Sequence, residues 1–205
     1  MDSTEVRHQW ETRSGAYSPE YYAHYGPDGA SETVCDVLER FVDPDGPILE
    51  LGCSSGRHLS YLYDNGFEDL AGIELNGDAF DVMAETYPGL AAAGTFHHAA
   101  IEDVVGGFED GCFDAVYSVE TLQHIHPDAE WVFEELARIT DGLIVTVENE
   151  NDGELTGGTD GDMNYVTEDV PLYYRDWNRV FTDLGFAELE ATVGDRDTVR
   201  VFRST

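Results

Sequence analysis

A glycine-rich turn follows directly on a short apolar run near residue 50. Residues 48–58 read Ile-Leu-Glu-Leu-Gly-Cys-Ser-Ser-Gly-Arg-His. Gly52 and Gly56 allow unusual backbone angles and let a ligand approach without meeting a Cβ. Glu74 follows about 20 residues later, where a carboxylate can accept hydrogen bonds from both hydroxyls of a ribose. This spacing predicts a nucleotide-like cofactor site built from a strand, a turn and a helix.

Two classes of cofactor compete for such a turn. A dinucleotide requires the pattern G-x-G-x-x-G, so that its pyrophosphate can sit on the helix N-terminus. Here Cys53 and Ser54 stand where the close-approach glycine would be, which leaves less room for a pyrophosphate. Glu50 adds a negative group that would repel phosphate and could hold an ammonium. The turn therefore favours a cationic cofactor, and a nicotinamide-dependent oxidoreductase is the alternative.

The elements that position these residues alternate between strands and helices. Continuous apolar runs predict strands buried on both faces, as in a parallel sheet. Apolar residues at helical spacing between them predict covering helices, one capped by Ser31 and one with Pro127 in its first turn. The final two strands are joined by a loop short enough for a hairpin. The expected strands are residues 48–51, 70–75, 95–99, 113–119, 143–147, 187–193 and 198–202.

This order predicts an α/β fold with a doubly wound, seven-stranded sheet that is mostly parallel and has an antiparallel C-terminal strand. No proline-rich or low-complexity stretch divides the chain, so residues 1–205 are expected to form a single domain. Within it, residues 1–30 form an aromatic N-terminal segment and residues 31–205 a Rossmann-like core. The acidic, glycine-rich residues 148–162 are expected to be a long loop.

The motifs between Ile48 and Val147 resemble those of the class I S-adenosylmethionine-dependent methyltransferases. The matching segments are residues 50–57, 72–76, 100–103, 113–118 and 121–125. The resemblance implies S-adenosylmethionine as the cofactor and a fold of the class I type. No metal is expected, because the sequence contains no constellation of metal ligands. It also implies a cofactor site formed by Glu50, Gly52, Cys53, Ser54, Gly56, Glu74, Leu75, Ile101, Glu102, Ser118 and Val119.

Within that implied site each segment has a role. The glycine turn would lie against the methionine part and the ribose, with Glu74 on the ribose diol. Ile101 and Glu102 would border the adenine, although many relatives carry Asp at that contact. Ser118 and Val119 would approach the sulfonium.

The methyl acceptor is less clearly marked. His124 follows the fourth strand and is the candidate catalytic base, while the alternative is that it only orders its loop. His126 is expected to cap the next helix. Glu148 and Asn149 could bind an acceptor or belong to a solvated loop. Three tyrosines could line the acceptor side of the site: Tyr165, Tyr173 and Tyr174.

The N-terminal segment is rich in aromatic residues and includes one arginine of interest, Arg13. The segment either folds over the site as a lid, with Arg13 pairing the cofactor carboxylate, or simply packs against the core. The aromatic residues concerned are Trp10, Tyr17, Tyr21, Tyr22 and Tyr25.

The chain carries 43 acidic against 10 basic residues, a formal net charge of -33, and every basic residue is arginine. Molar salt screens such repulsion, so the composition is typical of the cytoplasm of an extreme halophile, with an ordinary acidic protein as the alternative. The scattered arginines argue against nucleic acid or an anionic membrane as partner. The three cysteines are expected to be reduced thiols.

Together these observations predict an enzyme that transfers a methyl group from S-adenosylmethionine to a small-molecule acceptor. No N-P-P-Y-type sequence follows the fourth strand, so methylation of nucleic-acid bases is not indicated. The alternative is a cofactor-binding or regulatory protein that has the fold without turnover. Neither the acceptor nor the oligomeric state follows from the sequence.

Overall fold

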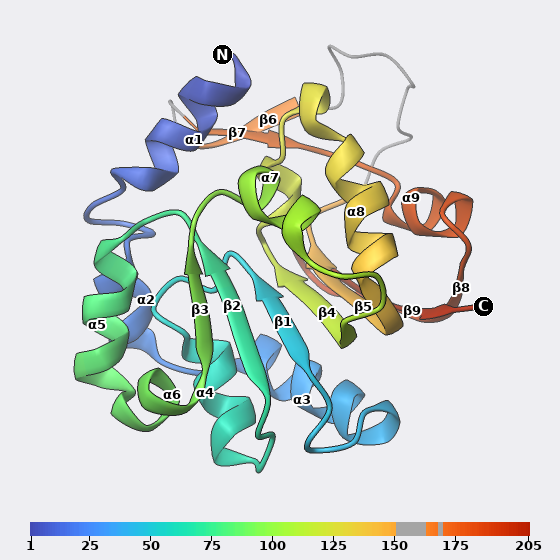
Figure 1. Ribbon diagram of the computed structural model, residues 1–205. Helices are drawn as coiled ribbons and strands as arrows, with labels where there is room; N and C mark the ends of the chain where they lie inside the picture. The colour runs from blue at the N-terminus through green and yellow to red at the C-terminus, as the bar shows by residue number, and fades with distance from the viewer. Residues whose placement is uncertain (151–162, 168–169) are drawn as a thin grey trace.

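A seven-stranded sheet forms the centre of the molecule, with the strand order β3-β2-β1-β4-β5-β9-β8 (Figure 1). The computed structural model describes residues 1–150, 163–167 and 170–205. Only β9 runs against its neighbours, because it pairs antiparallel with both β5 and β8. The strands are β1 Ile48–Leu51, β2 Leu70–Glu74, β3 Thr95–His98, β4 Phe113–Val119, β5 Thr140–Glu148, β8 Phe186–Val193 and β9 Thr198–Ser204. The predicted fold class is thus confirmed.

Helices cover both faces of this sheet. One face carries α3 (Gly29–Phe41), α4 (Arg57–Asp64), α5 (Asp78–Thr86) and α6 (Pro88–Ala93). The other carries α7 (Ile101–Val104), α8 (Trp131–Ile139) and α9 (Trp177–Asp183). The sheet is therefore the middle of three layers. Its central strands β1, β2, β4 and β5 are largely buried on both faces, as their apolar runs predicted, whereas the edge strands β3 and β8 are largely exposed.

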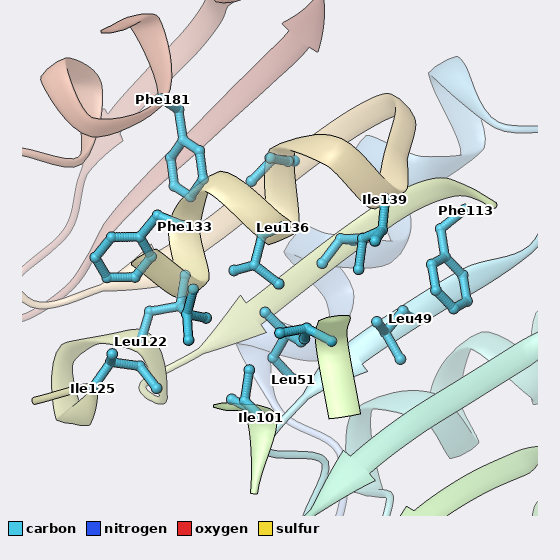
Figure 2. Close-up of a cluster of buried hydrophobic side chains, with 14 of the residues drawn as sticks. Leu49, Leu51, Ile101, Phe113, Leu122, Ile125, Phe133, Leu136, Ile139 and Phe181 are labelled. Carbon is cyan, nitrogen blue, oxygen red and sulfur yellow. The ribbon is translucent and has the colours of Figure 1, made fainter. Parts of the chain in front are cut away.

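The alternation of side chains along β1 divides the core into two clusters. Leu49 and Leu51 point toward α8, where they meet Leu136 and Ile139 (Figure 2). Ile48 points to the opposite face and packs with residues of α3 and α4. Glu50 follows the same alternation and shares the face of Ile48. This places a carboxyl group inside the second core cluster.

The described chain contains elements that sequence patterns did not predict. The N-terminal segment forms α1 (Ser3–Glu11) and α2 (Pro19–Tyr25). A separate two-stranded sheet consists of β6 (Met163–Thr167) and β7 (Val170–Tyr173). The expected loop over 148–162 begins later than predicted, because Glu148 still belongs to β5, and its residues 151–162 lie outside the described part of the chain.

Two helix starts also differ from expectation. Asp28, and not Ser31, caps α3, because its carboxylate accepts hydrogen bonds from the backbone N–H groups of Ala30 and Ser31. The Ser31 hydroxyl oxygen in turn accepts a hydrogen bond from the backbone N–H of Asp28, which completes a capping box. Pro127 lies in a short 3-10 turn, Pro127–Ala129, and α8 begins only afterwards. Among the described helices, none is both long enough and apolar enough to cross a membrane.

Candidate active site

A cavity opens at the edge of the sheet where the parallel strands end. It contains about 1050 Å³ of empty space, the open mouth included, and α1 and α2 form one of its walls. The loops that follow β1, β2, β3 and β4 form the rest. Ten predicted residues line it: Arg13, Gly52, Cys53, Ser54, Glu74, Leu75, Ile101, Glu102, Val119 and His124. The structure thus brings most of the predicted site together in one place.

The glycine turn after β1 is fixed by its neighbours. Gly52 has φ +67, and a Cβ there would collide with the side chain of Thr121 from the loop after β4. Gly56 has φ +80, and a Cβ there would lie 2.9 Å from both Met83 and Leu90. Gly56 does not line the cavity; its role is to let α4 begin close to α5 and α6. The two predicted glycines therefore serve different purposes, one at the cavity and one beneath it.

Glu74 ends β2 and lines the cavity with a carboxylate that the turn holds in place. Its Oε2 accepts a hydrogen bond from the backbone N–H of Ser54 at 2.8 Å, and its Oε1 accepts one from Asn76 at 2.7 Å. Burial raises the pKa of Glu74, while these backbone donors oppose that rise. Each oxygen has a second lone pair, so the group has capacity for a diol.

Glu50 and Ser118 lie outside the cavity wall, contrary to the direct contacts expected of them. Glu50 is 1% exposed and lies beside Tyr117, its register partner on β4. Burial raises the pKa of Glu50 well above its usual range, and the neighbouring Tyr117 hydroxyl opposes that rise. Ser118 is turned away from the cavity and donates a hydrogen bond to Glu148.

Glu148 holds the loop that follows β4. Its side chain is fully buried, and its carboxylate accepts hydrogen bonds from the backbone N–H groups of Thr121, Leu122 and Gln123 as well as from Ser118. Burial raises its pKa to about 7, and the four donors oppose the rise. Glu148, which was expected to contact an acceptor or solvent, is therefore buried and binds the backbone of the loop after β4.

Asn149 and Gln123 extend this anchorage. The backbone N–H of Asn149 donates to the side-chain oxygen of Gln123 at 2.9 Å. Arg175, which is 7% exposed, donates to the carbonyl of Ile125 at 2.6 Å. The end of β5 and the segment after β7 thus fix both sides of the loop that carries His124.

His124 lines the cavity and has its tautomer set by a neighbour. Its Nδ1 lies 2.8 Å from the carbonyl oxygen of Pro171, so Nδ1 carries the proton and donates it to that bond. Its ring centroid lies 4.8 Å from that of Trp10 on α1. Burial lowers the pKa of His124 to about 4. The imidazole is therefore neutral near pH 7, with Nε2 as a hydrogen-bond acceptor.

His126 has the structural role predicted for it. Its Nδ1 accepts a hydrogen bond from the backbone N–H of Asp128 at 3.1 Å, which caps the short turn that leads to α8. The three tyrosines expected on the acceptor side do not line the cavity. Tyr173 packs against His126, and Tyr174 accepts a hydrogen bond from Asn164, while Tyr165 is exposed on β6.

Three arginines line the cavity, Arg7 on α1, Arg13 between α1 and α2, and Arg57 on α4. Arg7 pairs with Asp103, and Arg57 of α4 pairs with Asp28, 2.5 Å away. The Arg13 guanidinium lies over the rings of Trp10 and Tyr17 and donates from Nε to the carbonyl of Ala16. Among the described residues of the wall, it is the arginine without a carboxylate partner.

Three residues other than glycine have φ in the left-handed region in the described chain, and all three line the cavity. They are Tyr17 at +65, Ser54 at +46 and Glu120 at +50. Such angles cost free energy and gather at functional sites, where the surroundings enforce them. For Ser54 the reason is its backbone hydrogen bond to Glu74. Glu120 was not predicted as a site residue, because strain is not visible in a sequence.

Comparison with known proteins finds a match between the central segment of the chain and a family model. Residues 49–145 match the family model described as a methyltransferase domain. In sequence, the chain is 25% identical over 122 residues to the eEF1A lysine and N-terminal methyltransferase of Xenopus laevis. The aligned part is 60% of this chain, and it spans 16% of the length of that relative.

Solved structures show the same fold. Magnesium protoporphyrin IX methyltransferase from Synechocystis PCC 6803, with bound SAH, has a TM-score of 0.70 at 14% identity, and the match covers 100% of both chains. The 1,6-didemethyltoxoflavin-N1-methyltransferase of Burkholderia thailandensis has a TM-score of 0.69 at 15% identity, over 95% of this chain and 94% of that one. Residues 49–145 thus resemble a methyltransferase domain in sequence, and the chain has the fold of these solved methyltransferases.

Proposed function

We propose that this methyltransferase acts on a small-molecule acceptor and that residues 1–205 work as a single domain. The observation that carries the proposal is the wall formed by α1 and α2, which places Val6 and Trp10 opposite the ends of the parallel strands. A cavity with such a wall suits an acceptor that is small enough to fit entirely inside it. A relative whose name specifies lysine and N-terminal sites keeps a protein acceptor as the alternative.

The cavity fits the cofactor at three points. Glu74 has oxygens available for the ribose diol. Ile101 and Glu102 form the part of the wall proposed to border the adenine. Arg13, which has no carboxylate partner among the described residues, suits the carboxylate of the methionine part. Glu50, which lies beneath the turn and outside the cavity wall, is proposed to reach the cofactor's ammonium through a water.

When bound, the cofactor supplies an electrophilic methyl on a sulfonium, whose C–S electron pair stays on sulfur as the new bond to the acceptor forms. The protein's part is to align the acceptor with that methyl and to exclude water. Val119 and Thr121 lie where β4 meets the glycine turn, and the loop anchored by Glu148 presents His124. His124 is proposed to accept a hydrogen bond from the acceptor at Nε2.

Calorimetry with S-adenosylhomocysteine in molar KCl tests the cofactor site. The Glu74→Ala variant is expected to weaken binding by about 1.5–3 kcal/mol, the range for hydrogen bonds to charged groups. The matched change Glu68→Ala, at an exposed carboxylate on the opposite edge of the sheet, should leave affinity unchanged. Equal affinities for the wild type and Glu74→Ala would show that the ribose lies elsewhere, and no binding by the wild type would contradict the proposal.

Arg13 can be tested with a ligand that lacks its proposed partner. The Arg13→Gln variant is expected to bind S-adenosylhomocysteine about 10-fold more weakly, because a charge-assisted hydrogen bond is lost. Its affinity for 5′-methylthioadenosine, which has no carboxylate, should equal that of the wild type. Arg203→Gln is the matched control, since Arg203 stacks on Phe41 away from the cavity. Equal losses for both ligands would assign Arg13 to packing instead.

The alternative is a protein that binds the cofactor without turnover. Labelled S-adenosylmethionine, incubated with the enzyme and a halophile cell extract, distinguishes the two. A methylated product that requires the enzyme excludes the non-catalytic alternative, and cofactor binding without any product supports it.

We infer from the composition that the protein works in the cytoplasm of an extreme halophile and that it does not bind nucleic acid. The absence of lysine and the net charge of -33 support this inference. Of the ten arginines, all of which lie in the described chain, eight have a carboxylate within ion-pair distance. They are thus largely engaged with the protein's own acidic groups, which leaves little cationic surface for phosphates.

A further inference from the structure

Glu120 occupies a special place in the cavity. It follows the last residue of β4, and its backbone N–H donates to the carbonyl of Val147 on β5. Its φ of +50 is a conformation that residues with a Cβ avoid, whereas glycine or asparagine adopts it readily. The sheet therefore holds a carboxylate in a strained conformation at the end of the strand beside the glycine turn, which is a reason to look for its function.

The charges around Glu120 do not balance. Arg196, from the loop between β8 and β9, donates to Glu120 Oε2 at 2.9 Å, and its Nε lies 3.9 Å from Asp197 Oδ1. One guanidinium thus serves two carboxyl groups. Arg57 contributes positive charge from α4, but it pairs with Asp28. The neighbour from α2 is the neutral phenol of Tyr22.

Asp197 adds a second carboxyl group next to Glu120, outside the residues that line the cavity. Asp197 Oδ1 is buried, and within the described chain it has no hydrogen-bond partner. A buried carboxylate oxygen without a donor is costly unless a ligand or water completes it. An ammonium group bound at Glu120 supplies N–H donors and the positive charge that two carboxyl groups sharing one guanidinium lack.

We propose that Glu120, whose negative charge Asp197 reinforces from outside the cavity wall, binds the amino group of the methyl acceptor, so that the acceptor is a small amine. This inference rests on the proposed function and specifies its substrate class. The apolar side chains of Val6, Trp10 and Ile125 in the same cavity suit an amine that carries an apolar group. Glu120 is then a catalytic residue that touches the acceptor.

The chemistry requires one proton to move. The ammonium gives a proton to Glu120 Oε1, and the nitrogen lone pair that this frees forms the bond to the methyl carbon. The positive charge that the sulfonium loses then appears on the methylated nitrogen, and Glu120 returns its proton to solvent. Burial and Asp197 raise the pKa of Glu120 to about 7, while Arg196 and Arg57 oppose the rise. His124, with a pKa of about 4, is the weaker base.

The substrate class is tested with labelled S-adenosylmethionine in molar KCl. The panel consists of primary and secondary alkylamines and arylalkylamines, together with alcohols and carboxylic acids of the same carbon skeletons. Label in amine products, and binding of those amines to the S-adenosylhomocysteine complex by calorimetry, support the proposal. Label only in alcohol or acid products, or in none of the panel, overturns it. If the wild type does not bind S-adenosylhomocysteine, the proposed function itself fails. This measurement therefore distinguishes failure of the proposed function from failure of the amine assignment.

Glu120→Gln is expected to lower kcat/KM for the methylated amine about 100-fold, the effect of losing a positioned base. The wild-type kcat/KM should rise with pH as Glu120 loses its proton, and Glu120→Gln should lack that rise. Affinity for S-adenosylhomocysteine should not change. Glu85→Gln, at an exposed carboxylate on α5, is the matched control.

A variant without backbone strain separates function from folding. Glu120→Gly favours the observed φ, so it should be folded, with a melting temperature no lower than that of the wild type, and equally poor at amine methylation. Amine turnover and a pH profile unchanged in Glu120→Gln and Glu120→Gly would overturn the assignment.

Discussion

The Glu148→Ala variant is expected to be about 3 kcal/mol less stable than the wild type. The change leaves three backbone N–H groups and the Ser118 hydroxyl without their buried acceptor, at about 1–3 kcal/mol for each unsatisfied group, partly offset because a buried carboxylate is itself costly. Chemical denaturation in molar KCl measures the loss. Glu134→Ala, at an exposed position on α8, is the control and should change stability by less than about 0.5 kcal/mol.

The carboxyl group of Glu148 also makes the stability of the folded protein depend on pH, with a sign that follows from its pKa. Its pKa in the folded protein, about 7, lies above its ordinary value of 4.5. The stabilisation of the folded state that protonated Glu148 provides is therefore complete below pH 4.5 and is lost as the pH rises through 7. Glu148→Gln, which cannot ionise, should lack this part of the slope of stability against pH. A slope identical to that of the wild type would show that Glu148 does not titrate in this range.

The wild-type protein is expected to unfold at room temperature in dilute buffer and to fold in molar KCl. A net charge of -33 opposes compaction, and the screening length falls from about 10 Å at 0.1 M salt to about 3 Å at 1 M. The structure shows one source of the repulsion at the edge of the sheet opposite the cavity. There the pKa of Asp114 is raised by burial and by the neighbouring charges of Asp141, Asp43, Asp45 and Asp69.

Circular dichroism and melting temperature, followed from 0.1 to 3 M KCl (roughly the range over which screening becomes complete), measure this effect. The double variant Asp43→Asn/Asp45→Asn should need less salt to fold, because it removes two of the charges around Asp114. The single variant Glu85→Gln, at an exposed position on α5, serves as the comparison for loss of charge alone. A melting temperature that does not depend on KCl would refute the inference of a halophilic protein.

The sheet could be predicted from the sequence because its strands carry continuous apolar runs, which both faces of a parallel sheet require. The order of strand and helix then left few topologies. The small sheet of β6 and β7 was missed, since Met163–Thr167 contains mostly polar or exposed residues and gives no apolar period. The helices α1 and α2 were missed for a related reason: aromatic residues hid their helical spacing.

Several residues that we propose bind the cofactor could be predicted to lie together, because they mark backbone features that depend on particular residue types. Gly52 and Glu74 mark a turn and the end of a strand, and both line the cavity. The acceptor half depends on where side chains turn after β4. The Ser118 side chain points toward Glu148, whereas Glu120 lines the cavity. Residue type alone does not predict which of the two side chains faces the cavity. Glu148 was expected near solvent, because an isolated Glu gives no sign that four donors from distant residues will surround it.

The reversed direction of β9 has a consequence for the evolution of specificity. Because β8 runs parallel to β5 and β9 returns beside it, the tip of their hairpin, residues 194–197, lies at the same edge as the parallel strand ends, where Arg196 meets Glu120. The four residues of this tip lie far in sequence from the glycine turn and Glu74. Changes in the length or charge of this tip can thus alter the range of acceptors among descendants of this chain. The glycine turn and Glu74, which we propose bind the cofactor, need not change with it.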